Sequence, residues 1–158
     1  MQILLRTRIV SFVCLVLVAL AVWTFVGAQT KDGHARGVRE TRGYTNVFPW
    51  PWCTWGADQE YFYLHRYFVP WRTNASAYQW TARAREFQWH VSTRPHHGAI
   101  INLQPGIQGA SAFGHVAVVV RVIDTQHVQA RGTSWGAHPT WWTTQTFHTG
   151  PGVTFLWH

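Results

Sequence analysis

The sequence predicts an α+β domain in which N-terminal helices pack on a mainly antiparallel β-sheet. Apolar residues follow helical spacing only between about residues 53 and 87, whereas short β-branched or alternating runs bounded by Gly and Pro begin at residue 98. Helices that precede the strands, instead of alternating with them, are typical of this fold class. With 158 residues, of which 47% are hydrophobic, the chain can bury one core of substantial size.

The first 28 residues have the features of a secretory signal peptide. Arg6 and Arg8 precede an uncharged run, Ile9–Val26, and small residues follow at Gly27 and Ala28. Residues 1–28 are therefore expected to be removed by cleavage after Ala28. The apolar run of about 18 residues is also close to the shortest membrane-spanning helix, so an uncleaved N-terminal anchor is the alternative.

The remaining chain divides into an arm and a domain. Residues 29–46 are polar and show neither helical nor strand periodicity, so we expect a flexible arm there. The domain is expected at residues 47–158. It starts with Phe48–Trp52, where two prolines between aromatic residues make a stiff segment, and continues with a predicted helix, Cys53–Tyr67.

A second helix is expected from Ala75 to about Phe87, with Asn74 as its N-cap. Strands follow, and Asp124-Thr125-Gln126 has the composition of a hairpin turn between two of them. The expected strands are Gly98–Leu103, Val116–Ile123, His127–Arg131, Trp141–Phe147 and Val153–Trp157.

The charge balance favours anionic partners. The net charge is +7, and from residue 29 onward eleven Lys and Arg against six Asp and Glu leave +5. The basic residues form no run and no known module, which argues against nucleic-acid binding. The His, Cys and carboxylate residues show no metal-site spacing, so no metal is expected.

Cys53 and His115 are the candidate catalytic pair. Cys53 falls in the first turn of the first predicted helix, where the helix dipole and free N–H groups favour a thiolate. His115 follows Gly114 at the start of a predicted strand, and a histidine within reach of the thiol can act as general base and then as general acid. The alternative is a small buried hydrophobic Cys53, because ten histidines make a chance Cys–His pair easy.

Five short motifs carry more specific information: Pro49-Trp50, Cys53-Thr54-Trp55, Gly98-Ala99-Ile100, Gln104-Pro105-Gly106 and Gly114-His115-Val116-Ala117. In residue type, order and spacing they resemble the CHAP family, the cysteine, histidine-dependent amidohydrolases/peptidases. The resemblance extends over about residues 47–158. It implies a papain-like fold and cleavage of amide bonds in bacterial peptidoglycan.

The same resemblance implies roles for single residues. Cys53 would be the nucleophile and His115 its base, while the family's third polar residue, usually Glu or Asn, corresponds to Gly132 and Ser134. Ser134 is the candidate for orienting the imidazole, because its hydroxyl can accept a hydrogen bond. Trp52 replaces a polar residue that often precedes the cysteine, so the backbone N–H of Cys53 would bind the oxyanion with less help.

Three tryptophans close to these residues in sequence, Trp52, Trp55 and Trp135, are candidates for substrate binding. Most of the eleven tryptophans are expected to pack in the core instead. For each of the three, packing in the core is therefore the alternative to substrate binding.

The sequence thus predicts an exported monomer that hydrolyses an amide bond of cell-wall peptidoglycan without a cofactor. Both an N-acetylmuramoyl-L-alanine amidase and a peptide endopeptidase fit. The protein would be secreted or wall-associated, or anchored to the outer face of the cytoplasmic membrane if the leader is retained. The rival prediction is a catalytically degenerate module that binds the wall or has a structural role.

Overall fold

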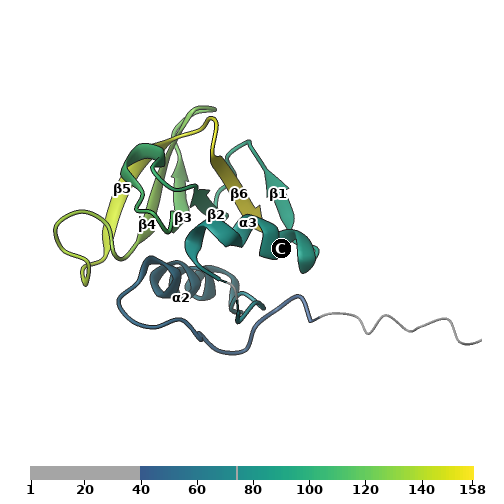
Figure 1. The fold of residues 1–158 in the computed structure, drawn as a ribbon. Coiled ribbons are helices and arrows are strands. Elements are labelled where there is room, and N and C mark those ends of the chain that lie inside the picture. The colour runs from purple at the N-terminus through teal and green to yellow at the C-terminus, as the bar shows by residue number, and fades with distance from the viewer. Residues whose placement is uncertain (1–39, 74) are drawn as a thin grey trace, which may run out of the picture. The chain divides into compact units, whose positions relative to one another are not determined.

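In the computed structural model, residues 40–73 and 75–158 are described, and they form an α+β domain (Figure 1). The predicted fold class is confirmed. The helices are α2 (Cys53–His65) and α3 (Trp80–Glu86), preceded in the latter case by the short 3₁₀ helix η1 (Ala77–Gln79). The predicted signal peptide, and the arm as far as residue 39, lie outside the described residues.

The strands form one antiparallel sheet in the order β1-β6-β2-β3-β4-β5, which can be followed in Figure 1 from β1 at one edge to β5 at the other. Hairpin pairing joins β3 to β4 and β4 to β5, whereas β6 returns to lie between β1 and β2. The strand bounds are β1 His90–Ser92, β2 Ile100–Leu103, β3 His115–Val122, β4 His127–Gly132, β5 Thr143–His148 and β6 Val153–Trp157.

The sheet is buried on both faces. Alternate residues of β3 face opposite sides, so Val116 and Val118 pack with α2 and α3, whereas Ala117 and Val119 pack in a second cluster with side chains of the neighbouring strands. The first cluster is rich in aromatic rings, among them Trp80. The first cluster, which contains Ala57 and Tyr61 of α2, holds this helix against the start of β3.

Most predicted elements agree with the structure, and the differences have local causes. The second predicted helix is divided into η1 and α3, and its N-terminus is capped by Ser76 and Gln79, whose side chains bond each other's backbone N–H groups. Asn74, the predicted N-cap, lies outside the described residues. Strand β1 was not predicted, because three residues are too few for a periodic signal.

Residues 40–46, at the end of the predicted arm, contact the domain. Gly43 forms an antiparallel bridge with Phe68, and the indole N–H of Trp89 donates a hydrogen bond of 2.8 Å to the carbonyl of Thr41. A Cβ on Gly43 would lie 2.2 Å from the carbonyl oxygen of Val69, so only glycine fits there. Within residues 40–73 and 75–158, no helix has the length and apolar character needed to span a membrane.

Candidate active site

A cleft of about 940 Å³ opens between the N-terminus of α2, the start of β3 and the segment that follows β4. Five of the six residues that the sequence singled out for the site line this cleft, although they come from three separate parts of the chain. They are Cys53, His115, Ser134, Trp52 and Trp135. The sixth, Trp55, does not line it.

Cys53 is the first residue of α2 and is a free, partly buried thiol. Burial raises the pKa of this thiol, while hydrogen bonds from the backbone N–H groups of Val116, Thr54 and Cys53 itself lower it. The net shift is upward, so the expectation of a thiolate favoured by the helix N-terminus is wrong for the resting site. The N–H groups act as expected, but desolvation outweighs them.

Val116 relates the two halves of the candidate pair. It directly follows His115 on β3, and its backbone N–H is one of the groups that lower the pKa of the Cys53 thiol. No hydrogen bond joins the thiol to the imidazole among the described residues. In unliganded sites such bonds are often formed only when substrate binds, so the shared cleft is the relevant observation.

The N-terminus of α2 is held against β4 by Thr133. The hydroxyl of this fully buried residue donates a hydrogen bond of 3.0 Å to the carbonyl oxygen of Trp52, the residue before Cys53. One turn along α2, a Cβ on Gly56 would lie 2.3 Å from the same hydroxyl oxygen. Glycine therefore allows the close approach that this hydrogen bond needs.

The aromatic segment before α2 is tied back by Asn46. Its amide donates a hydrogen bond of 3.0 Å to the carbonyl of Trp55, and its side-chain oxygen accepts one of 3.1 Å from the N–H of Phe48. Phe48 lines the cleft and packs on Trp80, with ring centroids 5.1 Å apart. The wall of the cleft next to Cys53 is thereby anchored to the core.

His115 begins β3 and is only 3% exposed. Burial lowers the pKa of its imidazole to about 3, so the ring is neutral at ordinary pH. The preceding Gly114 has a φ of 74°, and a Cβ there would lie 2.6 Å from the carbonyl oxygen of Leu103. Glycine at this position lets the chain turn tightly into β3 and directs His115 into the site.

Aromatic rings surround the imidazole. Its centroid lies 4.4 Å from the ring of Trp135 and 6.0 Å from that of Phe147, and these two rings meet edge to face at 5.0 Å. Across residues 40–73 and 75–158, we find no hydrogen bond to either ring nitrogen of His115. Packing, not a polar partner, restrains the imidazole in this part of the chain.

The two positions that correspond to the third polar residue behave differently. Gly132 ends β4 with its Cα hydrogen facing Ala117, since an added Cβ would lie 3.2 Å from the Cβ of Ala117. Ser134 lines the cleft in a left-handed conformation, with φ 58°, and its N–H donates to the carbonyl of Pro139 at 2.8 Å. Among the described residues that line the cleft, none is Asp, Glu, Asn or Gln.

Trp55 belongs to an aromatic cluster beside the cleft. Its ring meets Trp50 edge to face at 4.6 Å and lies 5.9 Å from Trp142. The guanidinium of Arg131 stacks over Trp142 at 4.4 Å and pairs with the buried carboxylate of Glu60. The contact of Trp55 with Trp142 therefore ties α2 to the segment before β5, and the pair of Arg131 and Glu60 ties α2 to β4.

Several residues of the site gave no recognisable signal in the sequence. Among the described residues that line the cleft, Arg72 is the only one with a charged side chain, and Ser76, Ser111 and Phe113 line it from the N-cap of η1 and the loop before β3. Gly56 is a residue for which the sequence does carry a signal, because a glycine inside a predicted helix indicates close packing at that position. In the part of the chain that the structure describes, no three His, Cys, Asp or Glu residues could hold a metal ion together.

Comparisons with known proteins agree with this arrangement. The CHAP domain family model matches residues 43–133, which is more than half of the chain and includes Cys53 and His115. A search of curated proteins found no match. Among solved structures, the chain is similar to an N-acetylmuramoyl-L-alanine amidase from Staphylococcus aureus, with 19% identity and a TM-score of 0.60. The likeness covers 79% of this chain but about a third of the amidase, 36% of its length. The chain therefore belongs to the CHAP domain family.

Proposed function

We propose that the protein is a cysteine-dependent hydrolase that cleaves an amide bond of bacterial peptidoglycan. The observation that carries the proposal is the shared cleft of Cys53 and His115, which come from the N-terminus of α2 and the start of β3. A nucleophile at a helix N-terminus beside a histidine base is a general arrangement for acyl transfer.

The reaction starts from a neutral pair, because burial raises the pKa of the Cys53 thiol and lowers that of the His115 imidazole. As the sulfur attacks the amide carbonyl carbon, its proton passes to the imidazole. His115 then gives this proton to the leaving amine, and the C–N bond breaks to leave a thioester. Water attacks the thioester, its proton passes through His115 to the sulfur, and a carboxylic acid is released.

The oxyanion formed in each step requires hydrogen-bond donors. The backbone N–H of Cys53, in the first turn of α2 where N–H groups have no intrahelical partner, is the donor proposed for the oxyanion. Partial positive charge at the helix N-terminus supports the same oxygen. Trp52, half-exposed at the edge of the cleft, contributes a ring surface for the substrate.

Positioning of the base is proposed to depend on aromatic packing. In many hydrolases a polar residue holds the imidazole in the productive orientation. Here Trp135 and Phe147 contact the ring of His115, and Ser134 is the nearest candidate for a polar contact in the cleft. We propose that a buried ring packed between these tilted aromatic rings keeps its orientation without a charged partner.

Peptidoglycan is proposed as the substrate because the chain is a CHAP domain and the similar solved structure is named as an amidase of N-acetylmuramoyl-L-alanine. Both the bond between sugar and peptide and a bond within the peptide fit this chemistry. Arg72, the one arginine among the described residues of the cleft, would attract carboxylates of the peptide. The place of action would then be the wall, reached by export of a monomer.

Digestion of purified peptidoglycan tests the proposal. Fragments are weighed by mass spectrometry after incubation with the parent chain and with Cys53→Ala. We expect the parent to produce fragments that gain one water at an amide bond, and Cys53→Ala to produce none. An undigested wall in both samples, alongside a positive control that cleaves it, would establish the rival.

The rival is a degenerate CHAP domain that binds the wall without cleaving it. The absence of Asp, Glu, Asn and Gln among the described cleft residues favours it. The two candidates differ in one result, since a binding module sediments with the wall equally well with and without Cys53 and releases nothing from it.

A further inference from the structure

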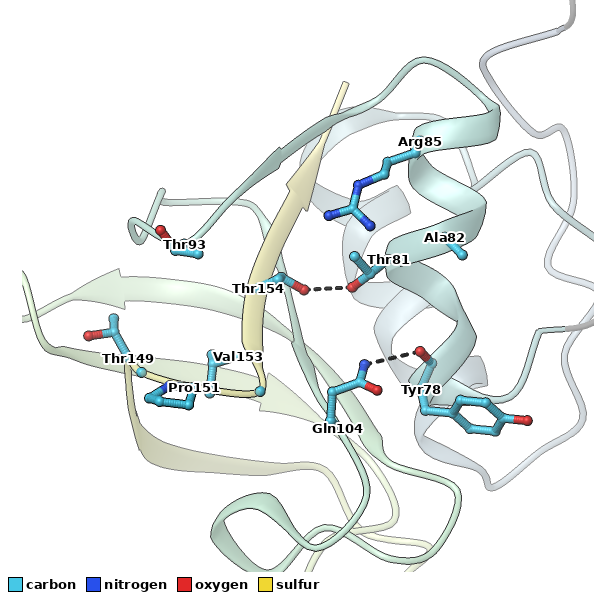
Figure 2. Close-up of a pocket in the computed structure, with 12 residues that line it drawn as sticks. Tyr78, Thr81, Ala82, Arg85, Thr93, Gln104, Thr149, Pro151, Val153 and Thr154 are labelled. Carbon is cyan, nitrogen blue, oxygen red and sulfur yellow. Dashed lines mark hydrogen bonds between the residues drawn. The ribbon is translucent and has the colours of Figure 1, made fainter.

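A second hollow, of about 710 Å³, lies between α3, β6 and the turn before β6 (Figure 2). It is separate from the candidate active site, although η1 borders both, with Ala77 on the active-site side and Tyr78 on the other. We propose that this hollow binds the C-terminal carboxylate of a short peptide, with Arg85 as the residue that holds the carboxylate.

Among the described residues that line the hollow, Arg85 is the only charged one. Figure 2 shows its guanidinium extending from α3 toward β6 and the loop that carries Thr93. Within the described residues, no carboxylate pairs with Arg85, whereas Arg83 on the same helix pairs with Glu86. An unpaired guanidinium in a concave site is suited to a bidentate contact with a carboxylate.

A network of hydrogen bonds gives the floor of the hollow a fixed polarity. Thr81 donates its only hydroxyl proton to the side-chain oxygen of Asn102 at 2.9 Å. The contact of 2.6 Å between the hydroxyls of Thr81 and Thr154 must then have Thr154 as donor. The oxygen of Thr154 therefore faces the hollow as an acceptor.

Gln104 is restrained in the same way. Its amide nitrogen donates to the carbonyl of Tyr78 and to the side-chain oxygen of Asn102, both at 3.1 Å. Both amide protons are thereby used, and the carbonyl oxygen of the side chain is left as an acceptor. Asn102 itself is fully buried, so the network is anchored in the core.

The hollow thus offers a cation beside two neutral acceptors. A complementary ligand needs an anionic group for Arg85 and an N–H or O–H donor for Thr154 and Gln104. The end of a peptide has both, because a terminal carboxylate is preceded by an amide N–H. The choice of peptide rests on the proposed function, since a protein that acts on peptidoglycan meets peptides with free carboxylates.

Binding of two dipeptides to the full chain tests this inference. The probes are N-acetylated alanyl-alanine with a free carboxylate and the same dipeptide with a C-terminal amide, titrated by NMR. The chain carries Cys53→Ala, so that binding is measured without cleavage and independently of the proposed function. We expect at least tenfold tighter binding of the carboxylate form, and loss of this preference in Arg85→Gln.

One arginine variant serves as the control. Arg94→Gln changes an exposed arginine outside the hollow and is expected to keep the preference. Equal binding of the two dipeptides, or a preference unaffected by Arg85→Gln, would overturn the inference. So would loss of the preference in Arg94→Gln, or tighter binding of a sugar acid such as glucuronate than of the carboxylate dipeptide.

Discussion

The hydroxyl of Thr133, fully buried just after β4, donates a hydrogen bond of 3.0 Å to the carbonyl oxygen of Trp52, the N-cap of α2. This one contact connects the segment that carries Ser134 and Trp135 to the residue before Cys53. The nucleophile and the groups around its base therefore depend on the same hydrogen bond.

Thr133→Val removes this donor while keeping the shape of the side chain. We expect the free energy of unfolding to fall by about 0.5–1.5 kcal/mol, because the carbonyl of Trp52 loses one of its two hydrogen bonds and keeps the one from the N–H of Gly56. Peptidoglycan hydrolysis should fall as well, since the start of α2 is less well held. Thr144→Val, at an exposed position of β5, is the matched control for urea unfolding. An unfolding midpoint of Thr133→Val equal to that of the control would contradict the role of the hydrogen bond.

Gly56→Ala is expected to destabilise the protein, although alanine is intrinsically the better helix former by about 1 kcal/mol. The added Cβ would lie 2.3 Å from the hydroxyl oxygen of Thr133 and 2.7 Å from its backbone nitrogen. Overpacking of this kind costs about 1–3 kcal/mol. The comparison is Gly132→Ala, whose Cβ would be 3.2 Å from that of Ala117. Thermal unfolding should show the larger loss for Gly56→Ala, and the reverse order would disprove the tight contact.

Trp135 is predicted to act as a positioning residue for His115. Trp135→Ala should lower kcat and raise the pKa of the acid limb of the pH–rate profile, because water reaches the imidazole when the ring is removed. Trp135→Phe should retain most of the parent rate. Trp141→Ala, which removes an exposed tryptophan outside the cleft, is the control. If Trp135→Ala raises KM but leaves the pH profile in place, the tryptophan binds substrate and does not position the base.

Asp58 is predicted to make stability decrease between neutral and mildly alkaline pH. Burial raises the pKa of this carboxyl to about 8, and only one of its oxygens has a partner, the N–H of Val69 at 2.7 Å. Above about pH 4 the unfolded chain loses this proton before the folded chain does, so the free energy of unfolding falls until about pH 8. The slope can reach on the order of 1 kcal/mol per pH unit.

The window from pH 6.5 to 8 isolates this effect. The lowered pKa of His115 acts the other way, since the unfolded chain takes up a proton below about pH 6.5 that the folded chain does not bind until about pH 3. Urea unfolding at several pH values should show a falling free energy for the parent and a flat one for Asp58→Asn. Asp124→Asn, at an exposed position, should keep the slope of the parent. A parent without any slope in this window would show that Asp58 is ionised in the folded protein.

The fold and the location of the site were largely predictable from local patterns. Prolines and aromatic residues before Cys53 mark the start of α2, and Gly114 before His115 marks the tight turn into β3, because both depend on backbone preferences of single residues. Recognition of the motifs around Cys53 and His115 then joined two segments that are distant in the sequence.

The electrostatics of the site could not be predicted in the same way. The helix N-terminus was expected to produce a thiolate, but the pKa of Cys53 depends on how deeply tertiary packing buries the sulfur. The contacts of Trp135 and Phe147 with His115 likewise arise from packing between distant elements. The same is true of the hydrogen bond from Thr133 to the carbonyl of Trp52. Nothing in the spacing of these residues along the chain indicates such contacts.

The central claim is that Cys53 and His115 act together on an amide bond of peptidoglycan. The most direct measurement is the rate at which new amino groups appear in purified peptidoglycan, for the parent, Cys53→Ala, His115→Ala and the double variant. Residues that act as one unit are not additive, so each single variant should fall to background and the double variant no further. A parent rate at background beside an active positive control, or a Cys53→Ala rate equal to that of the parent, would contradict the account.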